Sequence, residues 1–144
     1  MITDKFLRVS DAQAVTVTAV STDSIDLGTA RDMGEGRDLT MSFAVGTAFA
    51  GGTSTKFEII IADNAALTSN PVVVGSTDAL LTAALTAGKL IPVTINPQVA
   101  SLGKRYLGAR YTVSGTNSAG TVTAELVLDI QDGQKSYASG FSVV

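Results

Sequence analysis

The sequence predicts an all-β protein, an antiparallel sandwich or barrel of about eight short strands with at most one short helix. Apolar and polar residues alternate with a period of two along much of the 144-residue chain. Valine, isoleucine and threonine fill these stretches, and glycine or an Asn-Pro pair marks the turns between them. A chain of this length suits one domain, residues 1–144, with a sizeable core.

The first ten residues differ from the rest because they mix apolar and basic side chains without a glycine. They contain the stretch KFLRV, and two interpretations stay open: an ordinary first strand, or a segment that docks on a partner. The next clear alternation, AVTVTAV at residues 14–20, predicts a strand.

The middle of the chain predicts a hairpin. Residues 38–45 place four apolar side chains on one face, those of Leu39, Met41, Phe43 and Val45. Residues 46–52 form a glycine-marked connection, after which Phe57, Ile59 and Ile61 resume the alternation. We therefore expect two antiparallel strands that pair with each other across this connection.

The second half of the chain predicts strands at residues 72–74, 89–95, 104–114 and 121–130. Pro92 indicates an edge strand or a bulge, since proline cannot donate a hydrogen bond to a neighbouring strand. The first of the last two strands places on one face Arg105, Leu107, Ala109, Tyr111 and Val113. The second places on one face Val122, Ala124, Leu126, Leu128 and Ile130. Glycines at both ends of the connection between them predict a second hairpin.

Residues 77–87, TDALLTAALTA, favour a helix, with Thr77 or Asp78 as its N-cap and Gly88 at its end. A strand end followed by one helical turn fits the same residues equally well. The sequence leaves both interpretations open.

The composition argues against an enzyme. The sequence holds no cysteine, histidine or tryptophan, which excludes thiolate nucleophiles, sulfur-ligated zinc and Ser-His-Asp machinery. The formal net charge of −3 provides no broad basic field for nucleic acid. The first residues lack the apolar run of a signal peptide, and the chain has no uncharged apolar stretch of about 18 residues. We therefore expect neither a nucleic-acid partner nor a membrane partner.

Two short motifs have a chemical and a structural interpretation, and the structural one is favoured in each. Residues 46–53 have the glycine spacing of a phosphate-binding loop but carry Gly52 where that loop needs lysine. Ser101 and Lys104 match the S-x-x-K pattern of acylating serines, but its companion elements are missing from the sequence. We expect a connection between strands at the first and a loop that leads into a strand at the second.

Two groups of carboxylates lie beside glycines, Asp32, Glu35 and Asp38 in one and Asp129 and Asp132 in the other. Neither group follows the ligand order of an EF-hand. Arg31 and Arg37 are interleaved with the first group and compete for its carboxylates. A solvated, salt-bridged loop is favoured over a calcium site, so we expect no metal and no cofactor.

Six segments, taken in their order along the chain, resemble a family of tailed-phage capsid cement (decoration) proteins, the type known from a Bordetella phage. The segments are LRVSDAQAV (residues 7–15), STDSIDLG (21–28), AGGTS (50–54), ALTAG (84–88), GKRYLG (103–108) and QDGQKSYASGF (131–141). The resemblance runs almost end to end, and it depends on the order and spacing of these short segments.

The resemblance implies a jelly-roll β-sandwich that sits on the outer surface of an icosahedral virion and is assembled in the bacterial host cytoplasm. Such proteins bind between capsomers of the major capsid protein and stabilise the shell against DNA pressure. The Bordetella phage type implies a homodimer, and related cement proteins form trimers, so both homo-oligomers stay open. The alternative function is a carbohydrate-binding jelly-roll module of a phage adhesin, which would require exposed aromatic side chains or a calcium site. The tyrosines of the sequence are Tyr106, Tyr111 and Tyr137, and Tyr111 alternates with core residues.

The resemblance supplies no contact residues, so we predict them from the sequence. The expected capsid contacts lie in the first ten residues and in the arginine-bearing loop at residues 31–38, and are Lys5, Phe6, Leu7, Arg8, Arg31 and Arg37. We expect the basic side chains to pair with capsid carboxylates, and Phe6 and Leu7 to fill apolar pockets. Because exposed ion pairs contribute only about 0–1 kcal/mol each, the apolar anchors should matter more than the charges. Ile60 and Val127 lie opposite the core faces of their strands and are the expected self-association residues.

Overall fold

The computed structural model describes residues 3–33, 37–96 and 98–128 of the chain. These residues form strands, loops and short 3-10 turns, with no α-helix among them. The strands are β1 (Arg8–Ala14), β2 (Ala19–Val20), β3 (Ile25–Asp26), β4 (Leu39–Val45), β5 (Ser54–Ala62), β6 (Val72–Ser76), β7 (Leu80–Leu81), β8 (Leu90–Ile95), β9 (Tyr106–Ser114) and β10 (Thr121–Val127). The 3-10 turns are η1 (Lys5–Leu7), η3 (Thr82–Ala84) and η4 (Ala100–Leu102).

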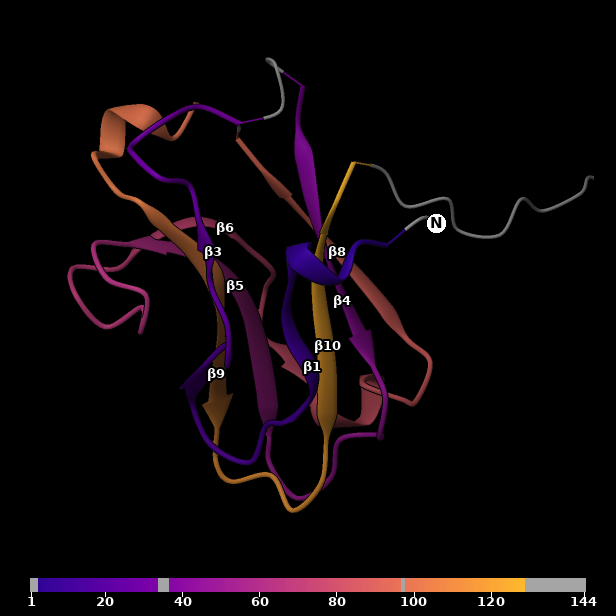
Figure 1. Cartoon of the computed structure of the whole chain (residues 1–144). Coiled ribbons are helices and arrows are strands. Elements are labelled where there is room, and N and C mark those ends of the chain that lie inside the picture. Colours follow the sequence, from indigo (N-terminus) through magenta and orange to yellow (C-terminus); the bar gives the residue numbers. More distant parts are fainter. Residues whose placement is uncertain (1–2, 34–36, 97, 129–144) are drawn as a thin grey trace, which may run out of the picture.

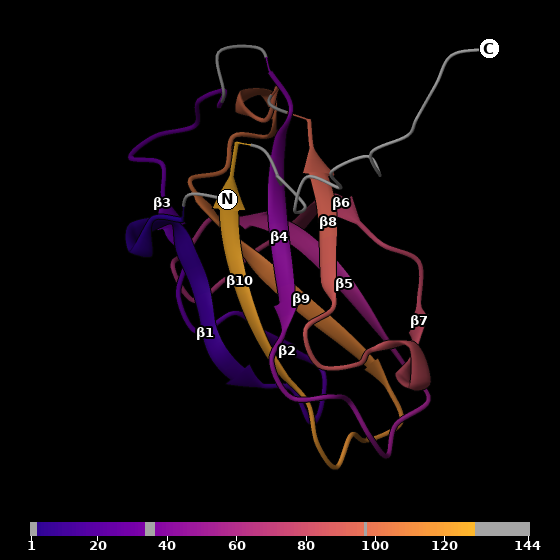
Figure 2. The ribbon, with the colours of Figure 1, turned by 90° about the vertical axis from the view of Figure 1, so that its right-hand side faces the viewer.

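Two antiparallel sheets face each other as the layers of a sandwich (Figure 1 and Figure 2). One sheet has the order β1-β10-β4-β8, and the other has the order β2-β9-β5-β6. Because β3 also pairs with β9 and β7 also pairs with β5, β2 with β3 and β6 with β7 each act as one interrupted strand. With each of these two pairs counted as one, the ten strands of the described residues become eight, numbered 1 to 8 along the chain. The two sheets then have the orders 1-8-3-6 and 2-7-4-5, which are those of a jelly roll and confirm the predicted fold class.

Both predicted hairpins are wrong. β4 pairs with β8 and β10, whereas β5 lies in the other sheet and pairs with β6, β7 and β9. The connection from β9 to β10 also crosses from one sheet to the other. Residues 46–53 and 115–120 are long enough to cross the roughly 10 Å between packed sheets. Alternation shows that each strand has a core face, but it does not distinguish pairing within a sheet from packing between sheets.

Three further predictions can be judged in this fold. Residues 14–20 do not form one strand, because β1 ends at Ala14 and the chain turns across to β2 in the other sheet. Residues 77–87 contain β7 and one 3-10 turn, so the helix prediction is wrong and the strand end with one turn is confirmed. A helix would need a continuous apolar stripe, but Leu85 is buried here while Leu81 is exposed. Pro92 lies in β8, an edge strand, as expected.

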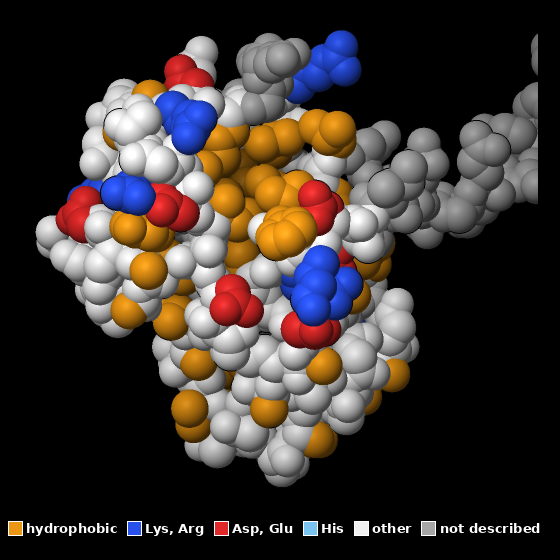
Figure 3. All heavy atoms as spheres, in the orientation of Figure 1, with side chains coloured by type: hydrophobic (Ala, Val, Ile, Leu, Met, Phe, Trp, Pro, Cys, Tyr) orange, Lys and Arg blue, Asp and Glu red, His pale blue; other side chains and the backbone are white. Residues whose placement is uncertain are grey.

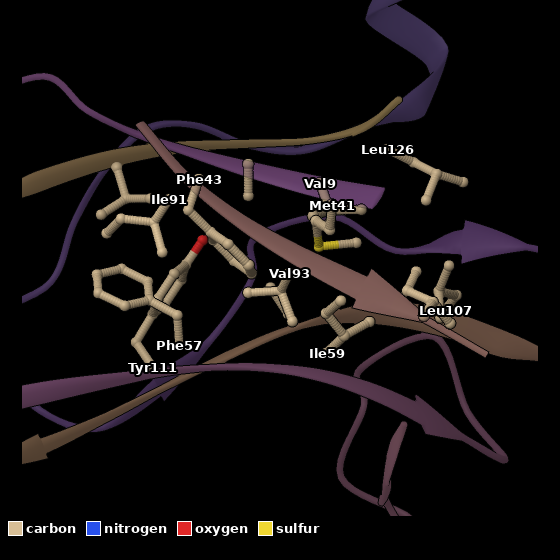
Figure 4. Close-up of a cluster of buried hydrophobic side chains, with 14 of the residues drawn as sticks. Val9, Met41, Phe43, Phe57, Ile59, Ile91, Val93, Leu107, Tyr111 and Leu126 are labelled. Atoms are coloured by element: carbon tan, nitrogen blue, oxygen red, sulfur yellow. The ribbon is translucent and has the colours of Figure 1, made fainter. Parts of the chain in front are cut away.

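The centre of the core is aromatic (Figure 4). Phe43 and Phe57 come from opposite sheets, and their ring centroids lie 5.3 Å apart. The ring of Tyr111 meets both edge-on, and its buried hydroxyl donates a hydrogen bond of 2.8 Å to Ser10 Oγ in the other sheet. Burial raises the pKa of Tyr111 well above its ordinary value. The two layers are therefore joined at their centre by both apolar packing and a buried polar contact.

Candidate functional site

The end of the sandwich at which β10 finishes carries a cluster of apolar side chains, here called the apolar end. It consists of Phe6, Leu7, Ile25, Leu27, Met33, Leu39, Leu126 and Leu128. The strand register explains why distant segments meet there. Arg8 lies opposite Glu125, Thr40 lies opposite Val127, and in the other sheet Ile25 lies opposite Leu107. The residues just before β1 and β4, and those just after β10, therefore reach the same end of the molecule (Figure 1).

The apolar end is thinly covered. The phenyl ring of Phe6 is 91% exposed, and the side chain of Leu128 is 78% exposed. Core residues beside them, such as Leu27, Met33 and Leu126, are buried but not fully, whereas Phe43, Phe57 and Tyr111 have no exposed surface. Figure 3 shows hydrophobic side chains gathered in a recess between the β3 side of the molecule and the end of β10.

Leu128 corrects a sequence expectation. The alternation of Val122, Ala124 and Leu126 continues to Leu128, which predicts a core position, and the first three are buried. β10 ends at Val127, however, so Leu128 extends past the last paired residue, and no strand of residues 3–33, 37–96 and 98–128 pairs with it. Ile130, predicted on the same face, lies outside the described residues.

The segment before β1 holds Phe6 in place on the surface. Asp4 caps η1, because its Oδ1 accepts a 2.9 Å hydrogen bond from the backbone N–H of Phe6 and its carbonyl accepts a 3.0 Å bond from Leu7. Lys5 and Phe6 are exposed, whereas Leu7 is half-buried against the core. The interpretation of the first ten residues as a strand is right from Arg8 onwards, whereas docking on a partner stays a prediction for the exposed capped turn before it.

The basic residues at this end contact groups of the same chain. Arg8 forms ion pairs with Glu125 at 3.0 Å and with Asp11 at 3.1 Å. The Arg31 guanidinium donates a hydrogen bond to the carbonyl of Leu27. Two of the expected capsid contacts, Arg8 and Arg31, thus bind partners within the chain. All six expected contacts lie towards one end of the sandwich: Lys5, Phe6, Leu7, Arg8, Arg31 and Arg37.

Acidic residues near the apolar end are also engaged. Asp26 accepts two hydrogen bonds from Arg105, at 2.6 and 2.7 Å, and these bonds, with one from the backbone of Gly28, lower the pKa of Asp26 to about 2. Asp32 accepts a 2.9 Å hydrogen bond from the backbone of Ala100. Arg8 and Asp26 therefore have partners of opposite charge within the chain, and Arg31 and Asp32 are bound to its backbone.

No group of three or more residues that could hold a metal ion is present among residues 3–33, 37–96 and 98–128. Of the two carboxylate groups considered in the sequence, Asp32 caps the backbone at Ala100, while Glu35, Asp129 and Asp132 lie outside the described residues. Of the S-x-x-K pair, Lys104 binds both carboxylate oxygens of Asp63, at 3.0 and 2.9 Å. In the described part of the chain, no helix is long and apolar enough to cross a lipid bilayer.

The predicted self-association residues are buried inside the protomer. Ile60 does face away from the main core, but it forms a second small cluster with Ala62 and Leu67, in which Val20 and Tyr106 also take part. The loop at residues 63–71 places Leu67 over this face, a covering that strand alternation does not reveal. Val127 is only 5% exposed. Neither residue offers a free surface to a second copy.

The tyrosines give little support to a sugar-stacking platform. Tyr111 is fully buried at the centre of the core. Tyr106 is half-buried, and the Arg105 guanidinium lies 5.2 Å from the centre of its ring. Tyr137 lies outside the described residues.

Comparison with known proteins identifies the family. No curated protein matches the chain. A family model described as Bbp16 matches residues 9–126, which extend from the second residue of β1 to the next-to-last residue of β10. This match covers the whole sandwich, and the chain belongs to the Bbp16 family.

Proposed function

We propose that this protein is a structural capsid cement protein, without enzymatic activity, on the outer surface of a tailed-phage head. It binds between capsomers of the major capsid protein and stabilises the shell against the pressure of the packaged DNA. Its other partner is a second copy of itself, in a homodimer or a trimer.

Three observations are in keeping with this role. The family name suggests a Bordetella phage protein, and six segments of the sequence resemble the cement proteins of a Bordetella phage. The jelly-roll sandwich is the fold that this resemblance implies. The third observation, the exposed apolar end, carries the proposal, because a soluble jelly roll that exposes Phe6 and Leu128 beside its own core presents a surface suited to another protein.

Weak contacts at each binding site are enough to stabilise the shell. A protein that binds the intact shell but not its separated parts stabilises the shell by mass action, by about 2.7 kcal/mol per site at a hundredfold excess over Kd. In an oligomer the second contact is intramolecular, so avidity exceeds the affinity of either contact alone. Many sites on one head multiply the effect.

The proposal is tested with heads that lack this protein, prepared from the phage that encodes it. Purified protein should bind these heads at saturable sites and should raise the temperature, and the strength of osmotic shock, at which they release DNA. The dependence on protein concentration should be steep. Heads that survive equally well with and without bound protein would contradict a cementing role, and hits on a glycan array would then favour the carbohydrate-binding alternative.

A further inference from the structure

We propose that the apolar end is the surface that docks on the capsid, and that what it binds is an apolar chain segment of the major capsid protein rather than a cluster of capsid carboxylates. This inference rests on the proposed function and names the chemistry of its contact. It keeps the sequence expectation that apolar anchors matter more than charges in the capsid contact, extends those anchors beyond Phe6 and Leu7, and drops the expected pairing of the arginines with capsid carboxylates.

The exposed groups at this end are apolar. Phe6 projects from a turn that Asp4 caps, so its ring is held on the surface by backbone contacts rather than by packing of its own side chain. Leu128 extends beyond the last pair of β10. Because Arg8 lies opposite Glu125, the residues that precede β1 run alongside the last residues of β10, which brings Phe6 and Leu128 to the same end of the sandwich. Figure 3 shows an apolar recess between the β3 side of the molecule and the end of β10.

The charged groups at this end are mostly occupied. Arg8 is held by Glu125 and Asp11, and Arg31 by the carbonyl of Leu27. On the acidic side, Asp26 is held by Arg105 and Asp32 by the backbone of Ala100. A partner with a dense acidic surface would have to compete with these contacts for Arg8 and Arg31, and would otherwise find only the exposed Lys5 and Arg37. An apolar segment can enter the recess and leave all of these contacts in place.

The size of the patch favours a capsid segment over a second copy. A stable protein–protein interface usually takes roughly 20–30 residues from each side. The apolar end has eight residues, of which Phe6 and Leu128 are largely exposed. A patch of this size suits a weak contact with the capsid, because in an oligomer the second such contact is intramolecular and avidity makes up for low affinity.

The test compares three full-length double variants in binding to heads that lack the protein. Phe6→Ser with Leu128→Ser removes both exposed apolar groups. Val17→Ser with Leu81→Ser is the matched control, because these side chains are 53% and 64% exposed near the other end of the sandwich. Lys5→Gln with Arg37→Gln removes two exposed cations of the apolar end.

The first variant should weaken binding by about tenfold or more, since it removes two large side chains from the contact. The control and the cation variant should change the affinity by less than about threefold, as is usual for exposed charges. The affinity of the unchanged protein should fall only slightly between low and high salt. An unchanged melting temperature of each variant verifies that it is folded.

Three results would overturn the inference. The first is normal binding by the Phe6→Ser, Leu128→Ser variant, and the second is a large loss in the cation variant with steep salt dependence. The third is a sedimentation experiment in which the apolar variant turns an oligomer into a monomer, which would assign the surface to a second copy. If the unchanged protein binds no heads at all, the proposed function itself fails, so the two failures are distinguishable.

An apolar fluorescent dye provides a readout that does not depend on the capsid. The free full-length protein should bind the dye, and Phe6→Ser with Leu128→Ser should reduce this binding several-fold. Absence of dye binding to the free protein would mean that the recess is already filled, which also overturns the inference.

Discussion

The two ends of the sandwich are closed in different ways. At the end opposite the apolar end, here called the hydrogen-bonded end, the loops at residues 46–53 and 115–120 are tied together by backbone bonds. Ala50 and Ala119 form a bridge, and Thr53 bonds to Ser114 at 2.9 Å. The ring of Phe49 lies beneath these loops and is only 6% exposed. At the apolar end the equivalent ring, that of Phe6, is exposed.

The contrast indicates which surface is structural and which is available for binding. At the hydrogen-bonded end, the loops bond to each other through their backbones and cover the ring of Phe49. They complete the core there and leave a partner little apolar area to bury. An end at which core leucines approach the surface beside an exposed phenylalanine still has apolar area to bury. We therefore place stability at the hydrogen-bonded end and recognition at the apolar end, and the following predictions test that division in order of expected effect.

The largest effect on the free energy of unfolding is expected when phenylalanine is replaced by alanine at each end in turn. Phe49→Ala removes a buried ring that meets Phe57 edge-on at 6.3 Å, and it should lower the free energy of unfolding by about 3–5 kcal/mol. Phe6→Ala removes a ring with no cover, and it should change the free energy of unfolding by about 0.5 kcal/mol or less. Urea denaturation measures both. If both variants lose a similar amount of free energy of unfolding, the two ends do not differ in their contribution to stability.

A smaller effect should come from the polar contact beneath the crossing loops. The Asn117 side chain is buried, and its Nδ2 donates to the carbonyl of Val15 at 3.0 Å. Asn117→Ala leaves that carbonyl without its side-chain donor and should cost about 1–3 kcal/mol in the free energy of unfolding. Thr116→Ala changes an exposed neighbour in the same loop and serves as the control. A loss no larger than that of the control would mean that water replaces the lost bond.

Sequence patterns predicted the strands better than they predicted either end. Alternation with a period of two identified the core faces of β4, β9 and most of β10, because it depends on burial alone. It could not assign a strand to a sheet, since the contacts of β4 with β8 and β10 join residues far apart in the chain. It also missed the loop that buries Ile60 and overestimated the cover on Leu128. Whether a loop or strand from elsewhere in the chain packs over a residue depends on the tertiary structure, so a local sequence pattern does not predict it.

The candidate site was predicted in part. The mixture of apolar and basic residues before β1 indicated a contact segment, and the structure places Phe6 on the surface there. The contributions of Leu27, Met33 and Leu128 were missed, because each belongs to a different segment and only the register of β10 with β1 and β4 brings them together. The ion pair between Arg8 and Glu125 was missed for the same reason, whereas the bond from Arg31 to the carbonyl of Leu27 is local and depends on how the loop after β3 folds.

The third prediction compares two carboxylates with similarly low pKa values. Burial acts to raise the pKa of Glu58, but hydrogen bonds from Arg110, Thr112 and Lys56 lower it from 4.5 to about 2. Its stabilising contribution should therefore be complete above pH 4.5 and should be lost as the pH falls towards 2. The difference in stability between the unchanged protein and Glu58→Gln should shrink over that pH window.

Asp26 is the control, because its pKa is also about 2 but its carboxylate is about half exposed at the apolar end. Asp26→Asn should have a smaller effect than Glu58→Gln, and high salt should reduce it further, because solvent screens exposed pairs. Thermal melts at several pH values and two salt concentrations separate the two variants. A larger effect of Asp26→Asn would make the apolar end a source of stability, contrary to the division proposed above.

The smallest effect concerns the internal partners of the charges at the apolar end. A double-mutant cycle with Arg8→Met and Glu125→Gln should give a coupling free energy of roughly 0.5–1 kcal/mol in the unbound protein, because the pair is partly exposed on the Arg8 side. The same cycle measured on head binding should give a coupling close to zero, since the pair stays intact when an apolar segment enters the recess. If the coupling is absent in the free protein but large in binding, Arg8 pairs with the capsid instead. That result would restore the expected pairing of Arg8 with capsid carboxylates, and it would give the apolar side chains a smaller role than the sequence predicts.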